Sequence, residues 1–288
     1  MIVVQLTING LLLGGLYLLL AQGMNLIFGV MRVLNLAHGA FLVGAGLLVF
    51  RLHEAYGINP IVAILIVAPC FFAIGALVQR LLLERIKAGG LEGELLTLML
   101  TYGLSYIVIN ISLRAFGAQY LSIPYLQSAL RIGSVTIDES LLVSAAVAIV
   151  LSIGLQAWLT STPSGKRLRA TSQSQIGALS CGVDTRRMRV LAFGIGSALA
   201  AAAGALIIVV RPLDPQISGD FTILAFVVVA LGGLGDYAGA AMGGAILGGV
   251  ESFGGYYLGA NVQAALPYIV MLLIMLLRPQ GLRPSAAL

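Results

Sequence analysis

The sequence has 288 residues, of which 59% are hydrophobic and only 9% are charged, and its mean hydropathy is +1.03. Soluble domains carry about 25% charged residues, so this composition excludes an ordinary soluble enzyme, a disordered chain and a secreted disulfide scaffold. The net charge of +5 does not indicate nucleic-acid binding, because the basic residues are few and lie between apolar runs. In a membrane protein such residues report orientation and contact with anionic lipid.

Apolar runs of membrane-spanning length follow one another along the whole chain. About 20 residues of helix cross the hydrocarbon core of a bilayer. The sequence therefore predicts an all-α, polytopic membrane protein with about eight or nine transmembrane helices, forming a single domain over 1–288. The second run is short and predicts a broken or re-entrant helix. The predicted spans are 6–30, 36–50, 60–83, 95–114, 139–160, 190–210, 221–236, 238–259 and 262–277.

Basic residues between these runs predict the orientation of the chain. With the N-terminus outside and alternating spans, twelve of the sixteen Lys and Arg residues fall on the cytoplasmic side. The positive-inside rule favours this arrangement, which places the C-terminus and the loop 161–189 in the cytoplasm. The residues predicted inside are Arg32, Arg80, Arg85, Lys87, Lys166, Arg167, Arg169, Arg186, Arg187, Arg189, Arg278 and Arg283; those predicted outside are Arg51, Arg114, Arg131 and Arg211.

Glycines recur at a spacing that lets membrane helices pack closely. Small residues four positions apart allow two backbones to approach where no hydrophobic effect drives association. The density of these pairs predicts that 232–259 is tightly packed rather than facing lipid on all sides. The pairs are Gly10/Gly14, Gly235/Gly239/Gly243, Gly244/Gly248 and Gly255/Gly259.

Sequence motifs for catalysis are absent. The two lysines, Lys87 and Lys166, are not followed by Ser or Thr, so there is no phosphate-binding P-loop. Only His38 and His53 could serve as histidine ligands, and neither H-E-x-x-H nor G-x-S-x-G occurs. The sequence predicts no cofactor, no metal site and no catalytic residues, and it favours a conduit whose energy source lies in another protein.

Polar residues lie between the first two apolar runs, where a long connection is absent. Asn35, His38 and Gly39 occupy this junction. One interpretation is a gate or a kinked element that lines a pathway, because glycine permits a break and polar side chains satisfy the freed backbone groups. The alternative is a tight cytoplasmic helix hairpin in which Asn35 and His38 act as helix caps.

A long basic loop, about 161–189, follows the fifth run. Leu168, Ile176 and Leu179 could line one side of a short helix that ends at Gly182. Two small residues in this helix would let another surface approach closely, Ala170 and Ala178. The segment is either a docking helix for a cytoplasmic partner or a solvated loop that satisfies the positive-inside rule.

A glycine-rich block joins the last spans. Gly232 and Gly233 predict a sharp turn, with Asp236 as a helix N-cap. Glu251 is the carboxylate placed well inside an apolar run. A membrane-embedded ionisable group is a functional candidate by default, and the alternative is a hydrogen bond between two helices.

Three stretches, taken in order, resemble the permease subunit of branched-chain amino acid ABC importers. They are Asn35 to Gly39, which reads Asn-Leu-Ala-His-Gly, the loop from Gly165 to Gly182, and the block from Gly232 to Glu251. The similarity extends over essentially the whole chain. It implies a fold of membrane helices related to the type II ABC importer permeases.

The resemblance also implies an assembly. Such permeases work with two cytoplasmic ATP-binding subunits, a second homologous permease and a periplasmic solute-binding protein, and the partner subunits hydrolyse the ATP. The segment from Arg169 to Gly182 resembles the family's coupling helix, although Arg169-Ala170-Thr171 stands where ABC importers often have Glu-Ala-Ala. The residues expected to couple to the ATPase are Arg169, Ala170, Gln175, Ala178, Leu179 and Gly182; those expected in translocation or gating are Asn35, His38, Gly39, Gly232, Gly233 and Glu251.

Several functions remain open at this point. The main prediction is import of branched-chain or other amino acids, since few charged residues along the spans suit a small zwitterion or a neutral solute. A permease for urea or short amides is an alternative within the same family type. A stand-alone channel or secondary carrier, or an intramembrane enzyme, would require ion sites or nucleophiles that the sequence does not display.

Overall fold

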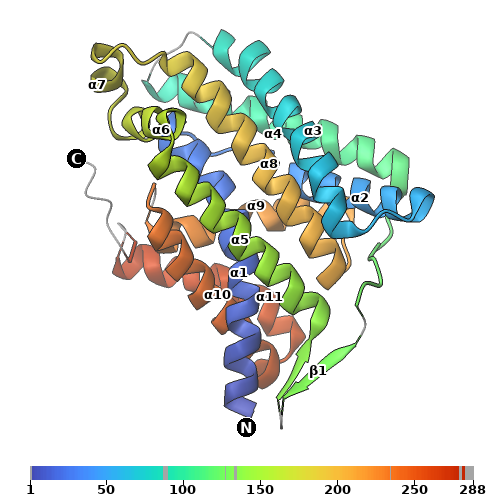
Figure 1. Cartoon of the computed structure of the whole chain (residues 1–288). Helices are drawn as coiled ribbons and strands as arrows, with labels where there is room; N and C mark the ends of the chain where they lie inside the picture. The colour runs from blue at the N-terminus through green and yellow to red at the C-terminus, as the bar shows by residue number, and fades with distance from the viewer. Residues whose placement is uncertain are drawn as a thin grey trace.

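The structure, a computed structural model, describes residues 2–86, 90–126, 128–132, 135–233, 235–278 and 281–282. Each predicted apolar run corresponds to one helix, so the all-α prediction is confirmed (Figure 1). By length and composition, six helices in the described part of the chain could cross a membrane. The helices that match the runs are α1 (Ile2–Met31), α2 (His38–Tyr56), α3 (Pro60–Leu81), α4 (Gly90–Phe116), α5 (Glu139–Ser161), α8 (Thr185–Val210), α9 (Ser218–Gly232), α10 (Tyr237–Leu258) and α11 (Ala260–Leu277).

Short elements connect these helices. The basic loop forms α6 (Pro163–Gln173) and α7 (Gln175–Ser180), and two 3-10 turns, η1 (Leu83–Arg85) and η2 (Pro215–Ile217), precede α4 and α9. Before α5 the chain forms an antiparallel hairpin of β1 (Ala129–Ile132) and β2 (Val135–Asp138). The hairpin was not predicted, because β1 reads Ala-Leu-Arg-Ile without strict alternation of apolar and polar residues, and only the four residues of β2 alternate.

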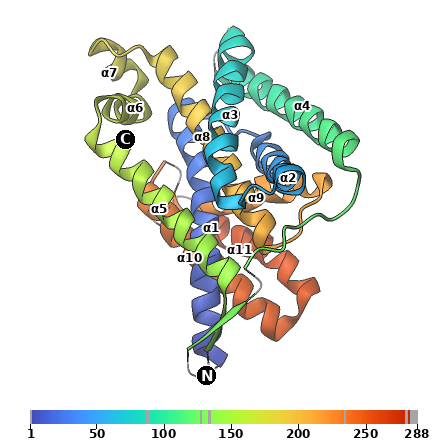
Figure 2. The ribbon, with the colours of Figure 1, turned by 45° about the vertical axis from the view of Figure 1, so that its right-hand side comes forward.

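The two ends of the bundle differ in what they carry. We call the end that carries α6 and α7 the loop end, and the end that carries β1 and β2 the hairpin end (Figures 1 and 2). Helices α1, α3, α5 and α9 end at the loop end, and α4, α8 and α10 begin there. The described basic residues that were predicted to share the cytoplasmic side therefore gather at the loop end.

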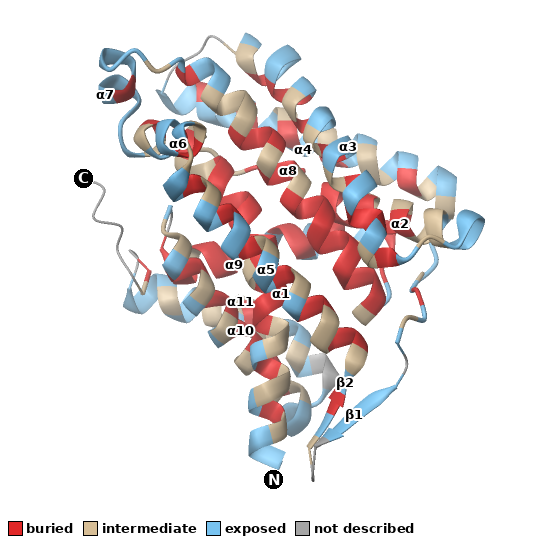
Figure 3. Cartoon of the chain, in the orientation of Figure 1, coloured by how far each residue is buried: buried red, intermediate tan, exposed pale blue. Residues whose placement is uncertain are grey.

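Helix α8 is central and α4 is peripheral. In the apolar window of α8, 83% of the residues are buried, against 22% in α4. Figure 3 shows the same contrast, with buried residues concentrated along α1 and α8. The outer helices instead expose large apolar side chains such as Leu65 and Ile111, as a surface in contact with lipid requires.

Glycine pairs bring α1 and α10 into backbone contact. A Cβ added at Gly10 would lie 2.8 Å from the Gly249 Cα atom, and one added at Gly248 would lie 2.2 Å from the Gly10 carbonyl oxygen. Gly14 and Gly244 meet in the same way one turn further on. The predicted close packing at Gly10/Gly14 and Gly244/Gly248 is thus confirmed, and it follows from the missing side chains.

The second helix is continuous, so the prediction of a break within 36–50 is wrong. Helix α2 runs unbroken from His38 to Tyr56. The break instead lies before it, where Arg32 adopts a positive φ of 59° and α1 stops. The chain then returns into the body of the bundle, because Asn35 and His38 are 1% and 0% exposed.

Candidate functional site

The basic loop folds into two helices rather than one. Ser174 has extended backbone angles, and its side chain accepts a hydrogen bond from the Gly177 N–H at 3.0 Å, which starts a new helix. Leu168 on α6 is fully buried, whereas Ile176 and Leu179 on α7 are 80% and 56% exposed. The prediction that these three residues line one side of a single helix is therefore wrong, because the break reorients α7.

Helix α7 ends as predicted at Gly182. Gly182 has a φ of +76°, and its N–H donates to the Leu179 carbonyl at 2.9 Å. The N–H of Val183 donates to the Ala178 carbonyl at 3.0 Å, which completes the paired pattern of a glycine-terminated helix. Ala178 is only 4% exposed, so the chain itself already covers this small residue.

The junction of α6 and α7 is tied to the end of α1. The Gln175 side-chain amide donates to the Val30 carbonyl at 2.9 Å. The Arg32 guanidinium donates to the Ser172 carbonyl at 3.0 Å. Arg169 is exposed on α6. The predicted coupling segment thus contacts α1 besides its own neighbours in sequence.

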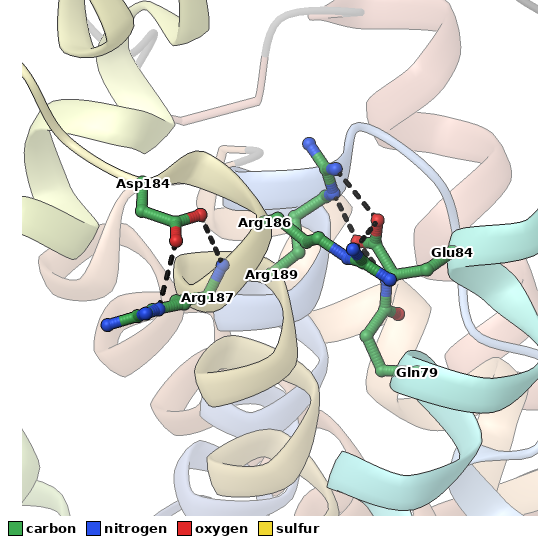
Figure 4. A network of polar contacts seen from close by, with 6 residues as sticks. All are labelled: Gln79, Glu84, Asp184, Arg186, Arg187 and Arg189. Atoms are coloured by element: carbon green, nitrogen blue, oxygen red, sulfur yellow. Dashed lines mark hydrogen bonds and ion pairs between the residues drawn. The ribbon is translucent and has the colours of Figure 1, made fainter.

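Ion pairs around Glu84 of η1, which follows α3, join this turn to α8 at the loop end (Figure 4). Glu84 accepts from the Arg189 guanidinium at 2.7 and 3.0 Å, and Arg186 lies 3.5 Å away. One turn earlier Asp184 caps α8 by accepting from the Arg187 N–H at 3.1 Å, and it also pairs with the Arg187 guanidinium. Bidentate pairs of this kind are strong and directional, so the cluster fixes α8 against η1.

Asn35 and His38 lie inside the bundle, and neither side chain caps α2. The Asn35 side-chain oxygen accepts from the Ala37 N–H at 3.0 Å, and Nε2 of His38 donates to the Leu20 carbonyl of α1 at 3.0 Å. Helix α2 begins without a side-chain cap. The predicted hairpin with two caps is therefore wrong. Within the described residues, Nδ2 of Asn35 and Nδ1 of His38 are buried without a partner.

Gly39 is the point at which α2 touches α9. A Cβ there would lie 2.0 Å from the Ser218 carbonyl oxygen, so the close approach requires glycine. The Gly39 N–H donates to the Thr222 hydroxyl at 2.9 Å. On the other side of the segment, the Leu36 N–H donates to the Thr101 hydroxyl of α4 at 3.3 Å. The segment 35–39 therefore contacts α1, α4 and α9 at once.

Gly232 and Gly233 form the turn at the loop end between α9 and α10. A Cβ on Gly232 would lie 2.3 Å from the Gly239 backbone, so the two helices cross in direct contact. Gly233 has a φ of +108° and ends α9. Asp236 accepts from the Ala238 N–H at 2.9 Å, which confirms the predicted N-cap.

A buried asparagine that the sequence analysis did not single out holds this turn. Asn25 of α1 is 0% exposed. Its side-chain oxygen accepts from the Gly235 N–H at 2.7 Å, and its amide nitrogen donates to the Asp236 carbonyl at 3.1 Å. The available signal was an amide side chain six residues before the end of the first helix, inside an apolar run. Helix α1 thereby links the turn to the loop that carries α7.

Glu251 lies on the part of α10 nearer the hairpin end. It is 7% exposed and accepts a hydrogen bond from the Tyr17 hydroxyl of α1. The interhelical hydrogen bond that was one interpretation of this residue is therefore present. The predicted translocation residues do not form one cluster: 35–39 lies inside the bundle, Gly232 and Gly233 lie at the loop end, and Glu251 lies beyond both.

Comparison with known proteins assigns this arrangement to a family. Residues 6–277 match the family model described as branched-chain amino acid transport system / permease component. The chain belongs to this family. The match covers nearly every described helix, so the predicted resemblance is confirmed over the length of the permease.

Curated relatives of the permease are similar over almost their whole length. The high-affinity branched-chain amino acid transport system permease protein BraD of Pseudomonas aeruginosa is 26% identical, over 96% of this chain and 94% of the relative. LivH of Escherichia coli K12 is 25% identical with the same coverage. A probable branched-chain amino acid transport permease protein LivH of Methanocaldococcus jannaschii is 26% identical over 95% of this chain and 90% of its own.

A solved structure shares the fold. PsaBC from Streptococcus pneumoniae in complex with Fab matches with a TM-score of 0.50 at 13% identity, over 94% of this chain and 91% of that chain. The similarity concerns the arrangement of the membrane helices. The permease is thus a multi-pass membrane protein of the transport family that the sequence predicted.

Proposed function

We propose that this permease is the membrane-spanning subunit of an ABC importer that carries branched-chain or other amino acids across the inner membrane. The names of its relatives and the family match support the transported class. The permease performs no chemistry on its solute in this proposal. Partner ATPases supply the energy, and a solute-binding protein delivers the solute.

The loop end faces the cytoplasm in this proposal, with the N-terminus of the chain outside and the C-terminus inside. Positive residues concentrate on the cytoplasmic side of membrane proteins, and α6 and the start of α8 supply six of the twelve basic residues that were predicted inside. The two ATP-binding subunits therefore dock at the loop end. The binding protein docks at the hairpin end, and a second homologous permease completes the pathway.

The observation that carries the proposal is the exposed tip of α7. Ile176 and Leu179 are large apolar residues, 80% and 56% exposed, on a six-residue helix that projects at the loop end (Figures 2 and 3). Outside a membrane, exposed apolar side chains grouped in this way mark a contact with another protein. The preceding helix α6 carries three exposed basic residues, Lys166, Arg167 and Arg169, so the site suits a groove with acidic edges.

Helix α1 provides a route from this tip to the pathway. The α6–α7 junction bonds to Val30 and Arg32, and Asn25 on the same helix holds the turn between α9 and α10. A displacement of α7 by the ATPases would be passed along α1 to the turn between α9 and α10. The ATPases can bias the two permease states only if they bind these states with different affinity. Asn35, His38, Gly39, Gly232, Gly233 and Glu251 are the proposed gating or translocation residues.

Substitution at the α7 tip tests the proposal. Leu179→Arg should abolish recovery of the ATP-binding subunits when the permease is purified from native membranes in mild detergent, because a cation replaces the docking side chain. Leu130→Arg is the matched control, since Leu130 is 40% exposed on the hairpin at the other end. Membrane insertion and yield should be the same for both variants.

Two results would contradict the proposal. If the wild-type permease is recovered without ATP-binding subunits and a second permease, it acts alone as a channel or carrier. If Leu179→Arg retains its ATPases and drives normal uptake, the loop 165–182 is an ordinary basic loop. Ala178→Arg is a poor substitute, because Ala178 is buried and the larger side chain would disrupt α7 itself.

A further inference from the structure

A cavity of about 310 Å³ opens between α9, α10 and α11, in the half of the bundle nearer the hairpin end. Sites for small molecules begin at about 300 Å³ and combine apolar walls with a few polar groups. The walls here follow that pattern. They are formed by Arg211, Ile217, Asp220, Phe221, Leu224, Glu251, Ala264, Pro267 and Tyr268.

Arg211 brings a positive charge into this cavity. It follows the last residue of α8, and its guanidinium carbon lies 4.7 Å from the centre of the Phe221 ring and 6.0 Å from that of Tyr17. Among the described residues, no carboxylate lies within the 4.0 Å of Arg211 that defines an ion pair. The aromatic faces hold the guanidinium, and its positive charge lines the cavity.

Two carboxylates face the same space. Glu251 is buried and is held by the Tyr17 hydroxyl. Asp220 is exposed in the first turn of α9, and the Tyr268 hydroxyl donates to it at 3.4 Å, a long hydrogen bond. Charged groups within a membrane protein are costly and mark solute or ion pathways, and here both signs occur in one cavity.

The remaining wall of the cavity is apolar. Phe221 and Leu224 are buried and lie one helical turn apart on α9. Ile217 precedes them, and Pro267 faces them from α11. A branched aliphatic side chain would find contact along this wall while charged groups occupied the other side.

We propose that this cavity is a transit site for a zwitterionic aliphatic amino acid. The solute carboxylate pairs with Arg211, its ammonium group lies at Asp220 and Glu251, and its side chain packs on Phe221 and Leu224. The inference rests on the proposed function and adds that the permease itself recognises both charges of the solute. Urea and short amides, which lack these charges, would not be retained there.

Thiol labelling in the assembled transporter tests occupancy of the cavity. The exposed cysteines Cys70 and Cys181 are first replaced by serine, and Ala264→Cys places one thiol in the wall. The whole complex is reconstituted with leucine-loaded binding protein and ATP, and reaction of the thiol with a charged methanethiosulfonate is timed. Leucine should slow labelling about threefold or more, and Arg211→Gln should remove that protection. Unchanged labelling during active leucine uptake would overturn the inference.

Uptake kinetics provide a second test that separates this inference from the proposed function. A charge-assisted hydrogen bond contributes about 10- to 100-fold in affinity, so Arg211→Gln should reduce kcat/KM for leucine by that factor. Asp220→Asn, at an exposed side chain that does not threaten folding, should reduce it about 2- to 5-fold, as expected for one partly solvated pair. Arg114→Gln, at an exposed arginine on α4, is the control and should transport normally.

The outcomes are distinct. No ATP-dependent leucine uptake by the wild-type complex would contradict the proposed function. Normal wild-type uptake with unchanged kcat/KM in both Arg211→Gln and Asp220→Asn would contradict the transit site alone. An equal loss in Arg114→Gln would show that general surface charge, rather than the cavity, controls uptake.

Discussion

Arginine and glutamate occur together near both ends of this permease, paired at one end and lining a common cavity at the other. At the loop end, Glu84 accepts two hydrogen bonds from Arg189 and is also close to Arg186. Toward the hairpin end, Glu251 bonds to a tyrosine and Arg211 rests on aromatic rings. The first arrangement satisfies its charges within the protein and serves as a joint between helices. The second leaves charged groups facing a cavity, as a site for a solute requires.

Breaking the ion pair of Glu84 and Arg189 should have the largest effect on stability. Glu84→Ala leaves Arg189, which is 27% exposed at its side chain, without its carboxylate. Removing one partner of a buried ion pair costs about 3 kcal/mol or more. We expect a loss of this size in the free energy of unfolding, measured by denaturant titration in mixed micelles.

The matched control for this change is Glu54→Gln. Its partner Arg51 is 65% exposed and Glu54 is 51% exposed, so solvent screens the pair. Exposed pairs contribute about 1 kcal/mol or less. Equal losses in the free energy of unfolding for Glu84→Ala and Glu54→Gln would show that the ion pairs of Glu84 do not hold α8 against η1.

Removal of the buried amide at the loop end should have an intermediate effect. Asn25→Ala deletes the hydrogen bonds to Gly235 and Asp236, and each such bond contributes about 1 kcal/mol. The free energy of unfolding should fall by about 2 kcal/mol. Asn110→Ala is the control, because Asn110 is exposed and bonds only within its own helix among the described residues. If both variants unfold alike, Asn25 does not hold the turn between α9 and α10.

The smallest effect on stability should come from substitution of Arg211 in the cavity. Arg211→Gln removes contacts with aromatic rings that contribute about 1 kcal/mol. Its free energy of unfolding should therefore change by no more than about 1 kcal/mol, while leucine uptake falls as described above. A loss of stability as large as that of Glu84→Ala would mean that Arg211 is another structural joint, and the contrast between the two ends would fail.

Local patterns predicted the helices well and the contacts between them poorly. Each apolar run became one helix, and the caps at Gly182 and Asp236 form as their residue types dictate. The pair of Glu84 and Arg189 joins residues 105 positions apart, and no local pattern brings them together. Ser174 had the residue type of a helix cap, yet the run of helix-compatible residues around it favoured one continuous helix.

The position of the polar junction between α1 and α2 could not be read from its composition. Asn35 and His38 suit a solvent-exposed turn as well as a buried one, because both environments require polar side chains. Burial was decided by distant partners on α4 and α9, which close over the segment. The same dependence explains why Gly39 looked like a generic break and proved to be a contact that excludes any side chain.

The buried junction also constrains how the chain is made. When α2 emerges from the ribosome, Leu20 is already available to His38, but Thr101 and Thr222 have yet to be synthesised. The segment 35–39 therefore waits, with unsatisfied polar groups, until more than half of the remaining helices have been inserted. Biogenesis must hold the first two helices in a provisional arrangement, and α9 is the element whose arrival completes it.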